Sequence, residues 1–195
     1  MIPFFVDIFT EPDDVPLLGR RIAALGMGYP GESNDLVVEV VAPEDYADAA
    51  SGEDADRSVA LTFRNRVMKA GGTAIGRARA PMLGVRLTGW GVRTNAWPRL
   101  AFELLKARAP LYDFAAPMSR RFNDCDMADL KAIVSQGSYL PDGNDMNLGT
   151  FASFFGMDRL QEYPPNGMGV KDAMEQRIYA VADIYGRYAD FSGKE

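Results

Sequence analysis

The sequence predicts an α/β protein in which helices flank a mixed β-sheet. Segments rich in β-branched and aromatic residues, which are typical of strands, are concentrated in the first half of the chain. Apolar residues at helical spacing dominate the second half. No internal repeat or interdomain linker interrupts the 195 residues. We therefore expect one domain that covers residues 1–195, with helices packed around a central sheet.

Strands are predicted over residues 2–6, 35–41 and 81–89. Residues 15–28 end at a Gly-rich, Pro-containing stop, and they predict either a short helix or a loop-strand element. The acidic segment 43–56 predicts a solvated loop or a short exposed helix. Residues 58–70 have amphipathic helical spacing, and we expect Gly71 and Gly72 to end that helix.

Further helices are predicted over residues 98–109, 124–136, 147–155 and 171–191. The first of them has Pro98 in its first turn, where proline is tolerated. The last is the longest helical pattern of the chain and carries one apolar face. Residues 137–146 and 161–169 are rich in Gly, Pro and Asn and predict irregular loops.

Composition excludes several classes of chemistry. The chain has no histidine, which excludes the usual nucleophile–histidine systems and His-ligated zinc. Its one cysteine, Cys125, can form neither an intramolecular disulfide nor a thiolate cage for zinc. A metal site would have to use carboxylate oxygens and hold Mg²⁺, Mn²⁺ or Ca²⁺. The net charge of −6 argues against broad electrostatic binding of nucleic-acid backbone, although metal ions in an acidic cleft can neutralise phosphate locally.

The apolar runs are short. None approaches the ~20 residues that a helix needs to span a bilayer. No basic region precedes the first apolar stretch, so we expect neither a membrane segment nor a signal peptide. A single cysteine suits a reducing compartment, and we expect a cytoplasmic protein.

Two short motifs carry most of the functional information. Residues 7–13 (DIFTEPD) follow the first predicted strand, and residues 179–183 (YAVAD) form a Tyr-x-x-x-Asp within the last predicted helix. Residues 7–13 resemble the Asp-Ile-Glu-Thr-x-Pro-Asp opening of 3′–5′ exonucleases that have four acidic catalytic residues. Phe9 stands where the second carboxylate of that opening belongs.

Other segments extend this resemblance in the same order. Residues 90–100 (WGVRTNAWPRL) resemble the motif Trp-Asn-Gly-x-x-Phe-Asp-x-Pro-x-Leu, and residues 126–130 (DMADL) are similar to Asp-Leu-Met-Asp-Val. Residues 148–157 (LGTFASFFGM) look like the short helix Leu-Asp-Glu-Ile-Ala-x-Leu-Leu-Gly-Ile. The chain thus resembles the predicted 3′–5′ exonuclease family related to the proofreading domain of family-B DNA polymerases, in the tyrosine subtype of the DEDD superfamily. The resemblance implies an RNase H-like fold, and residues 14–86 are much harder to match.

The resemblance implies metal-dependent phosphodiester hydrolysis at a site that is degenerate in this chain. Two Mg²⁺ ions roughly 3.5–4 Å apart activate a water and stabilise the departing 3′ oxygen. By resemblance, Asp7 and Asp183 are the remaining ligands for Mg²⁺ or Mn²⁺, and the Tyr179 hydroxyl orients the attacking water. Phe9 and Ala96 offer no ligand, so we expect weak metal binding at most and strongly reduced activity.

Glu11 is a candidate replacement ligand. Strand alternation puts residues 7, 9 and 11 on one face, although Pro12 indicates that the strand ends there. Residues near these acids are also predicted to contact nucleic acid: Thr10, Trp90, Arg93 and Asn95.

Structural roles compete with each of these assignments. Asp7 could cap a turn at the end of the strand, Asp183 could pair with Arg187 at i+4, and Tyr179 could be a core residue. Phe9, Trp90 and Trp97 could form a base-stacking platform, but packing that fills the metal pocket is the favoured interpretation. Asp126 and Asp129 could be a solvated helix start.

Three functions follow as hypotheses. The first is a catalytically impaired exonuclease-like protein that still binds single-stranded nucleic-acid 3′ ends, or a protein partner, through the cleft. The second is an active exonuclease that uses Asp7, Glu11 and Asp183 with one or two Mg²⁺ ions. The third is an interaction module that kept only the fold.

Overall fold

The computed structural model of the chain describes residues 2–12, 15–31, 33–46, 48–75, 85–109, 127–134, 147–157 and 160–192. Several predicted features lie outside these residues, including Cys125, Asp126 and the loop over residues 137–146. None of the described helices is both long enough and apolar enough to cross a membrane.

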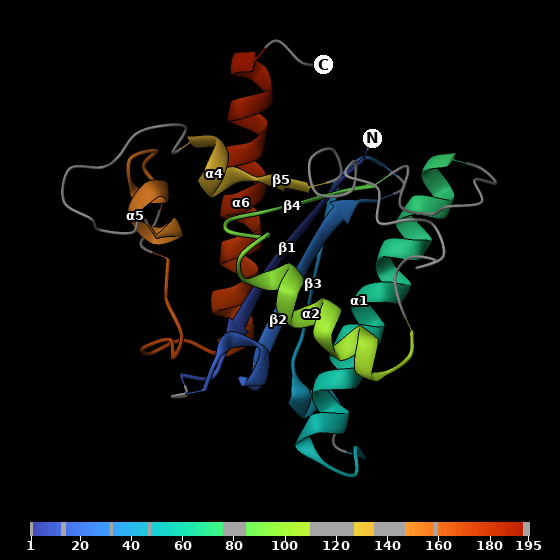
Figure 1. Cartoon of the computed structure of the whole chain (residues 1–195). Coiled ribbons are helices and arrows are strands. Elements are labelled where there is room, and N and C mark those ends of the chain that lie inside the picture. Colours follow the sequence, from blue (N-terminus) through green and yellow to red (C-terminus); the bar gives the residue numbers. More distant parts are fainter. Residues whose placement is uncertain are drawn as a thin grey trace.

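The centre of the fold is a five-stranded mixed sheet with the order β3-β2-β1-β4-β5 (Figure 1). Its strands are β1 Ile2–Thr10, β2 Ile22–Pro30, β3 Leu36–Val41, β4 Val85–Gly89 and β5 Met127–Asp129. Strands β1, β2 and β3 form an antiparallel meander, whereas β4 and β5 add in parallel to the other side of β1. Because β1 is central, its side chains are covered from both faces, which explains its apolar composition.

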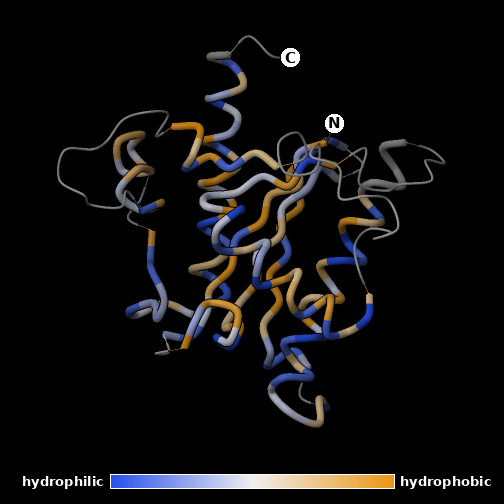
Figure 2. The backbone as a smooth tube through the Cα atoms, in the orientation of Figure 1, coloured by the Kyte–Doolittle hydropathy of each residue, from blue (hydrophilic) through white to orange (hydrophobic). Residues whose placement is uncertain are grey.

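Helices cover the two faces of the sheet, α1 and α2 on one side and α6 on the other (Figure 1). The helical elements are η1 Leu17–Gly19, η2 Pro43–Tyr46, α1 Gly52–Ile75, α2 Ala96–Lys106, α4 Leu130–Val134, α5 Leu148–Ser153 and α6 Val170–Ser192. Apolar residues concentrate along the strands between these helices, and polar residues lie toward the solvent-facing turns (Figure 2). The predicted α/β class with a mixed sheet and flanking helices is confirmed.

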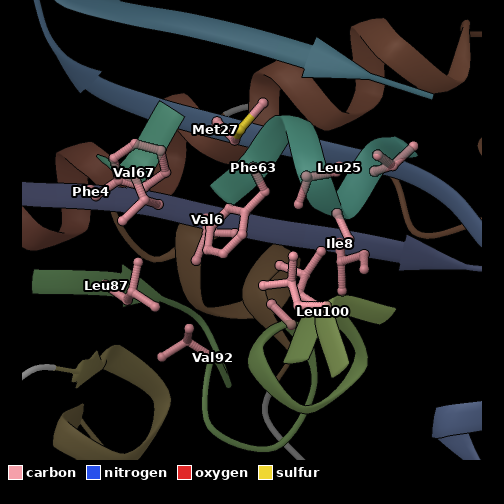
Figure 3. Packing of buried hydrophobic residues seen from close by; sticks show 14 of the residues in the cluster. Phe4, Val6, Ile8, Leu25, Met27, Phe63, Val67, Leu87, Val92 and Leu100 are labelled. Carbon is pink, nitrogen blue, oxygen red and sulfur yellow. The ribbon is translucent and has the colours of Figure 1, made fainter. Parts of the chain in front are cut away.

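Alternation along β1 assigns its side chains to the two faces. The side chains of Phe4, Val6 and Ile8 pack with Phe63 of α1 and Leu100 of α2 (Figure 3). The opposite face carries Phe5, Asp7 and Phe9, each of which contacts α6. The sequence therefore places one carboxylate between two phenylalanines at the interface of the sheet with the last helix.

Two glycines of β2 let α6 approach the sheet closely. A Cβ atom on Gly26 would lie 2.6 Å from Ile178 Cγ1, and one on Gly28 would lie 2.7 Å from Ile178 Cγ2. Gly26 is also the cross-strand partner of Asp7. Because a Cβ atom at either position would force side chains of α6 to shift, this glycine pair allows the close packing that brings α6 against the strands around Asp7.

Some element predictions were wrong in detail. Residues 124–136 were predicted as one helix, yet residues 127–129 pair with β4 as a strand before α4 begins at Leu130. Residues 15–28 contain most of β2, so the loop-strand interpretation is correct. Helix α1 runs from Gly52 to Ile75, so the Gly71-Gly72 pair does not end it. Hydrogen bonding to the neighbouring strand and tertiary packing overrode local propensity in these segments.

Candidate functional site

Asp7 is the buried carboxylate of the sheet–α6 interface. It is 2% exposed, and its Oδ1 accepts a hydrogen bond of 2.9 Å from the backbone N–H of Ile8. Its Oδ2 accepts from Arg177 Nε of α6 at 2.6 Å. A charged carboxylate at this depth is stable only with a partner of opposite charge, and Arg177 supplies it. The expectation that Asp7 caps a turn is therefore wrong, because a helix residue far along the chain binds it.

Arg177 connects Asp7 to the protein surface. Its side chain is 8% exposed, and its Nη1 lies 3.2 Å from Glu162 Oε2, a carboxylate that is 55% exposed. The guanidinium carbon also lies 5.2 Å from the centroid of the Phe9 ring. Burial by itself lowers the pKa of the Arg177 guanidinium, but the nearby carboxylates of Asp7 and Glu162 outweigh it, so the pKa lies above the usual value. Arg177 is therefore a permanent cation in this site.

Phe9 fills the space beside this ion pair. Its ring is 4% exposed, lies 5.7 Å from the Tyr163 ring and packs with Ala173 and Met174 of α6. A ring this deeply buried cannot serve as a stacking surface for a base. The packing interpretation of Phe9 therefore agrees with the structure.

Asp183 lies apart from Asp7. It follows Arg177 by six residues, which corresponds to about 9 Å along a helix and a different helix face. Asp183 is 48% exposed, and its Oδ2 accepts from Arg187 Nε at 2.7 Å, as the i+4 alternative predicted. The residue of α6 that contacts Asp7 is Arg177, so the two acids contact different arginines in this structure, and joint metal binding by Asp7 and Asp183 stays a prediction. Strand β1 and helix α6 lie against each other as expected, but the α6 residue that contacts Asp7 is a cation, Arg177.

Tyr179 is also a surface residue, with 49% of its area exposed. The alternative that placed it in the core is therefore wrong. Tyr179 and Asp183 line a shallow groove of about 290 Å³ together with Met157 and Leu160. This groove lies on the solvent side of α6, whereas Asp7 lies under the helix.

Glu11 does not join the Asp7 cluster. The pairing of β1 with β2 shifts register between Phe9 and Thr10, which breaks the alternation that was expected to align residues 7, 9 and 11. Glu11 is exposed beyond the end of β1, and its backbone N–H donates to the carbonyl of Arg21 at 2.9 Å. Thr10, the last residue of β1, is only half-buried.

The turn between β4 and α2 carries the other predicted nucleic-acid contacts. Trp90 is 7% exposed, and its ring lies 4.9 Å from that of Phe151, so it is a core residue and not a free stacking surface. Arg93 is exposed and its Nη2 donates to the Met127 carbonyl at 3.2 Å. Asn95 is half-buried and precedes α2 without a capping hydrogen bond from its side chain. Ala96, at the position expected for a metal-binding Asp, is buried at 2% exposure.

Asp129 has a structural role that sequence reasoning missed. It is 5% exposed, and its carboxylate accepts from the backbone N–H groups of Gly91 and Arg93 at 3.1 Å and of Ala132 at 3.3 Å. The carboxylate therefore fixes the turn after β4 and begins α4. Asp129 does lie at a helix start, as interpreted, but it is buried and not solvated.

A cleft of about 770 Å³ is lined by α5 and by the segment that precedes α6, and neither Asp7 nor Arg177 is among its lining residues. Glu162, which pairs with Arg177, is one of its lining residues. The Asn147 side chain caps α5 by accepting from the Thr150 N–H at 2.7 Å, and both residues line the cleft as well. The polar lining comprises Asn147, Thr150, Ser153, Gln161, Glu162 and Asn166. It is rich in amide and hydroxyl groups and has one carboxylate.

The carboxylates of the site do not fit a divalent metal. Within the described ranges, no group of three or more His, Cys, Asp or Glu side chains is arranged to hold a metal ion. Asp7 and Glu162 both contact the same guanidinium, which satisfies the charge that a cation would otherwise balance. A hard divalent ion prefers several anionic oxygens, and this site provides them only to Arg177.

A second buried ionic cluster lies on the opposite face of the sheet. Arg99 of α2 is 2% exposed and donates to Glu103 Oε1 at 2.5 Å, to Asp56 Oδ2 at 3.0 Å and to the Arg20 carbonyl at 2.6 Å. Arg21 Nε also donates to Asp56 Oδ2 at 2.7 Å. The cluster joins α1, α2 and the segment before β2, and sequence reasoning did not predict it.

Solved structures share this arrangement of sheet and helices. E. coli exonuclease I in complex with a dT13 oligonucleotide is similar with a TM-score of 0.56 and 11% identity, over 96% of this chain and 41% of that chain. The family B DNA polymerase from the hyperthermophilic archaeon Pyrobaculum calidifontis is similar with a TM-score of 0.57 and 17% identity, over 97% of this chain and 24% of that chain. The fold is exonuclease-like.

This exonuclease-like fold confirms the predicted RNase H-like architecture. The chain spans less than half the length of these two proteins. No protein-family model and no curated protein matches the sequence. At identities of 11% and 17% the likeness establishes the fold, and the chemistry of the site has to be argued from this chain's own residues.

Proposed function

We propose that this exonuclease-like protein binds the end of a single-stranded nucleic acid without hydrolysing it efficiently. The observation that carries the proposal is the 2.6 Å contact between Arg177 Nε and Asp7 Oδ2, an ion pair that Glu162 connects to the cleft. The acidic residue that the sequence motif marks as catalytic is bound to an internal cation.

The loss of hydrolysis follows from what two-metal chemistry needs. Such a site holds its ions with several carboxylates and uses them to activate water and to stabilise the leaving oxygen. Here Asp7 binds Arg177, Phe9 and Ala96 are apolar, and Asp183 binds Arg187 on the solvent side of α6. Each lost decade of rate corresponds to about 1.4 kcal/mol of transition-state stabilisation, so the combined loss amounts to many decades.

The cleft that Glu162 lines supports binding. Its amide and hydroxyl side chains can donate to phosphate and sugar oxygens and to base edges. A protein of the same fold, exonuclease I, has been crystallised with a dT13 oligonucleotide. The net charge of −6 weakens long-range attraction to phosphate, so we expect binding to be modest and strongest at low salt.

The first experiment measures cleavage. A 5′-labelled single-stranded oligonucleotide is incubated with the protein in Mg²⁺ or Mn²⁺, beside the double variant Asp7→Asn/Asp183→Asn. We expect no more nucleotide release from the wild type than from the double variant. Release that the double variant abolishes would instead support an active exonuclease that uses Asp7, Glu11 and Asp183.

The second experiment measures binding by fluorescence anisotropy with the same oligonucleotide. Asn166 lines the cleft and is exposed, so Asn166→Asp adds a negative charge there and is expected to weaken binding several-fold. Asn65 is an exposed residue of α1, on the other face of the sheet. Asn65→Asp adds the same charge there and is expected to leave affinity unchanged. Equal effects of the two variants, or no binding at low salt, would contradict the proposal.

Exposed aromatic residues favour a protein partner as a second candidate. Phe154 is 72% exposed and Phe155 40% exposed at the end of α5, and Tyr179 is 49% exposed on α6. Aromatic side chains of this kind are enriched at protein interfaces. If the oligonucleotide does not bind at low salt, this interaction-module function becomes the better account.

A further inference from the structure

The Asp7 cluster has the charge arrangement of a cation site whose cation is part of the chain. Two acidic groups from distant segments, Asp7 of β1 and Glu162 before α6, lie 2.6 Å and 3.2 Å from nitrogens of one guanidinium. The guanidinium carbon lies 5.2 Å from the centroid of the Phe9 ring. Carboxylates and an aromatic ring thus surround a single positive charge that is almost fully buried.

We propose that Arg177 takes the place of a divalent cation in this cluster, and that the cluster is a latent divalent-cation site that becomes able to bind a metal when the guanidinium is removed. The proposal deepens the proposed function, because it starts from the same ion pair and explains why that site does not hydrolyse its ligand.

Competition for the same oxygens explains why the guanidinium excludes a metal in the wild-type protein. A divalent ion that bound Asp7 Oδ2 would have to displace Arg177 Nε from it. The displaced side chain is 8% exposed and packs on Phe9, so it would be left as a buried cation without its partner. An arginine of the chain cannot dissociate, whereas a metal must be recruited from solution.

Removing the guanidinium reverses this balance. The variant Arg177→Gln leaves Asp7 buried with no internal counter-charge, and Glu162 stays on the other side of the space that the guanidinium occupied. Arg177→Glu adds a third carboxylate on a side chain that extends into the same space. Hard cations such as Mn²⁺ and Mg²⁺ are held by anionic oxygens of this kind, so both variants are expected to gain affinity for them, and the Glu variant most.

The experiment measures the melting temperature with EDTA and with 5 mM MnCl₂ or MgCl₂, and free Mn²⁺ by electron paramagnetic resonance. We expect no metal-dependent shift for the wild type, a small rise for Arg177→Gln and a rise of about 3 °C or more for Arg177→Glu. Asp7→Asn in either background should abolish the rise, because it removes the buried ligand. Neither readout involves an oligonucleotide, so this proposal and the proposed function fail separately.

Two results would overturn the proposal. One is a wild-type protein that binds Mn²⁺ and loses that binding in Asp7→Asn, which would mean that the guanidinium does not exclude metal. The other is an Arg177→Glu protein without metal-dependent stabilisation. If Arg177→Glu does not fold even with Mn²⁺, Arg177→Gln beside Asp7→Asn/Arg177→Gln decides: equal responses of these two proteins to Mn²⁺ would also overturn it.

Discussion

Two buried arginines, one on each face of the sheet, can be compared directly. Arg99, on the α1–α2 side, is 2% exposed, and its carboxylate partners Asp56 and Glu103 are each 1% exposed. Arg177, on the α6 side, is similarly buried but contacts one enclosed carboxylate, Asp7, and one solvent-exposed carboxylate, Glu162.

The hydrogen bonds of the two guanidinium groups differ in the same way. Arg99 donates from Nε, Nη1 and Nη2 to three partners. Arg177 donates from Nε, and its Nη1 has an ion contact at 3.2 Å but no hydrogen bond with good geometry to any residue that the structure describes. Within the part of the chain that the structure describes, each cluster leaves one buried atom without a hydrogen bond, Glu103 Oε2 on one face and Arg177 Nη1 on the other. The difference lies in the surroundings: both carboxylates of Arg99 are enclosed, which is typical of a structural crosslink, whereas Arg177 is joined through Glu162 to a solvent-exposed cleft.

The largest effect is expected from Arg99→Met. The change leaves Glu103 with the partly exposed Lys106, and it leaves Asp56 with Arg21 and the backbone N–H of Ile22. Because a buried cation is lost between two buried carboxylates, we expect it to lower the free energy of unfolding by about 3–5 kcal/mol. Arg57→Met is the matched control in the half-exposed pair with Asp54 on α1, and should cost about 1 kcal/mol or less. Urea denaturation measures both, and equal losses would contradict a structural role for the Arg99 cluster.

Arg177→Met is expected to have the next largest effect. It leaves Asp7 buried without a cation, which should cost about 3 kcal/mol, while Glu162 can be solvated. Adding Asp7→Asn should recover part of this loss, because the double variant carries no buried charge. Arg187→Met, on the same helix but in the exposed pair with Asp183, should cost less than about 1 kcal/mol. Strictly additive effects of the Asp7 and Arg177 changes would contradict direct coupling between them.

The smallest effect is expected at the surface pair of Lys171 with Asp45, which joins the start of α6 to η2. Burial raises the pKa of Asp45, but hydrogen bonds from Lys171 and from the Ala42 N–H outweigh it, and the net pKa is lowered. The hydrogen bond to Asp45 raises the pKa of Lys171. Lys171→Met should therefore cost no more than about 1 kcal/mol at neutral pH.

The pH dependence of this surface pair has a definite sign. The contribution of Asp45 is present above its unfolded pKa of about 3.9 and is lost as pH falls through its lower folded pKa. The contribution of Lys171 is present below its unfolded pKa of about 10.4 and is lost as pH rises through its higher folded pKa. The stability difference between wild type and Lys171→Met should thus be constant between about pH 5 and 9 and shrink in acid. A difference that grows in acid would contradict this assignment.

Much of the fold could be predicted from the sequence because its central elements have strong patterns. The apolar run that begins at residue 2 identified β1, and helical spacing identified α6 to within one residue at each end. Strand β5 was missed because three residues carry too little signal, and only pairing with β4 makes them a strand. Local sequence also did not fix the two ends of α1, because packing against the sheet extends this helix beyond the predicted residues 58–70.

The site was predicted less well because spacing in sequence does not fix which residue faces the strand. The motif at residues 179–183 lies on a helix, but the inward face of that helix carries Ala173, Met174, Arg177 and Ile178. An arginine inside this apolar stripe was a readable signal of a buried ion pair. The register shift after Phe9, which removes Glu11 from the site, left no comparable signal.

The central claim is that Asp7 is neutralised by Arg177 and not by a metal. The most direct test is a crystal of the wild-type protein soaked in Mn²⁺, with diffraction recorded at the manganese absorption edge. We predict no anomalous peak within coordination distance of Asp7 and an Arg177 Nε that remains about 2.6 Å from Oδ2. A manganese peak on Asp7 with the guanidinium displaced would contradict the account.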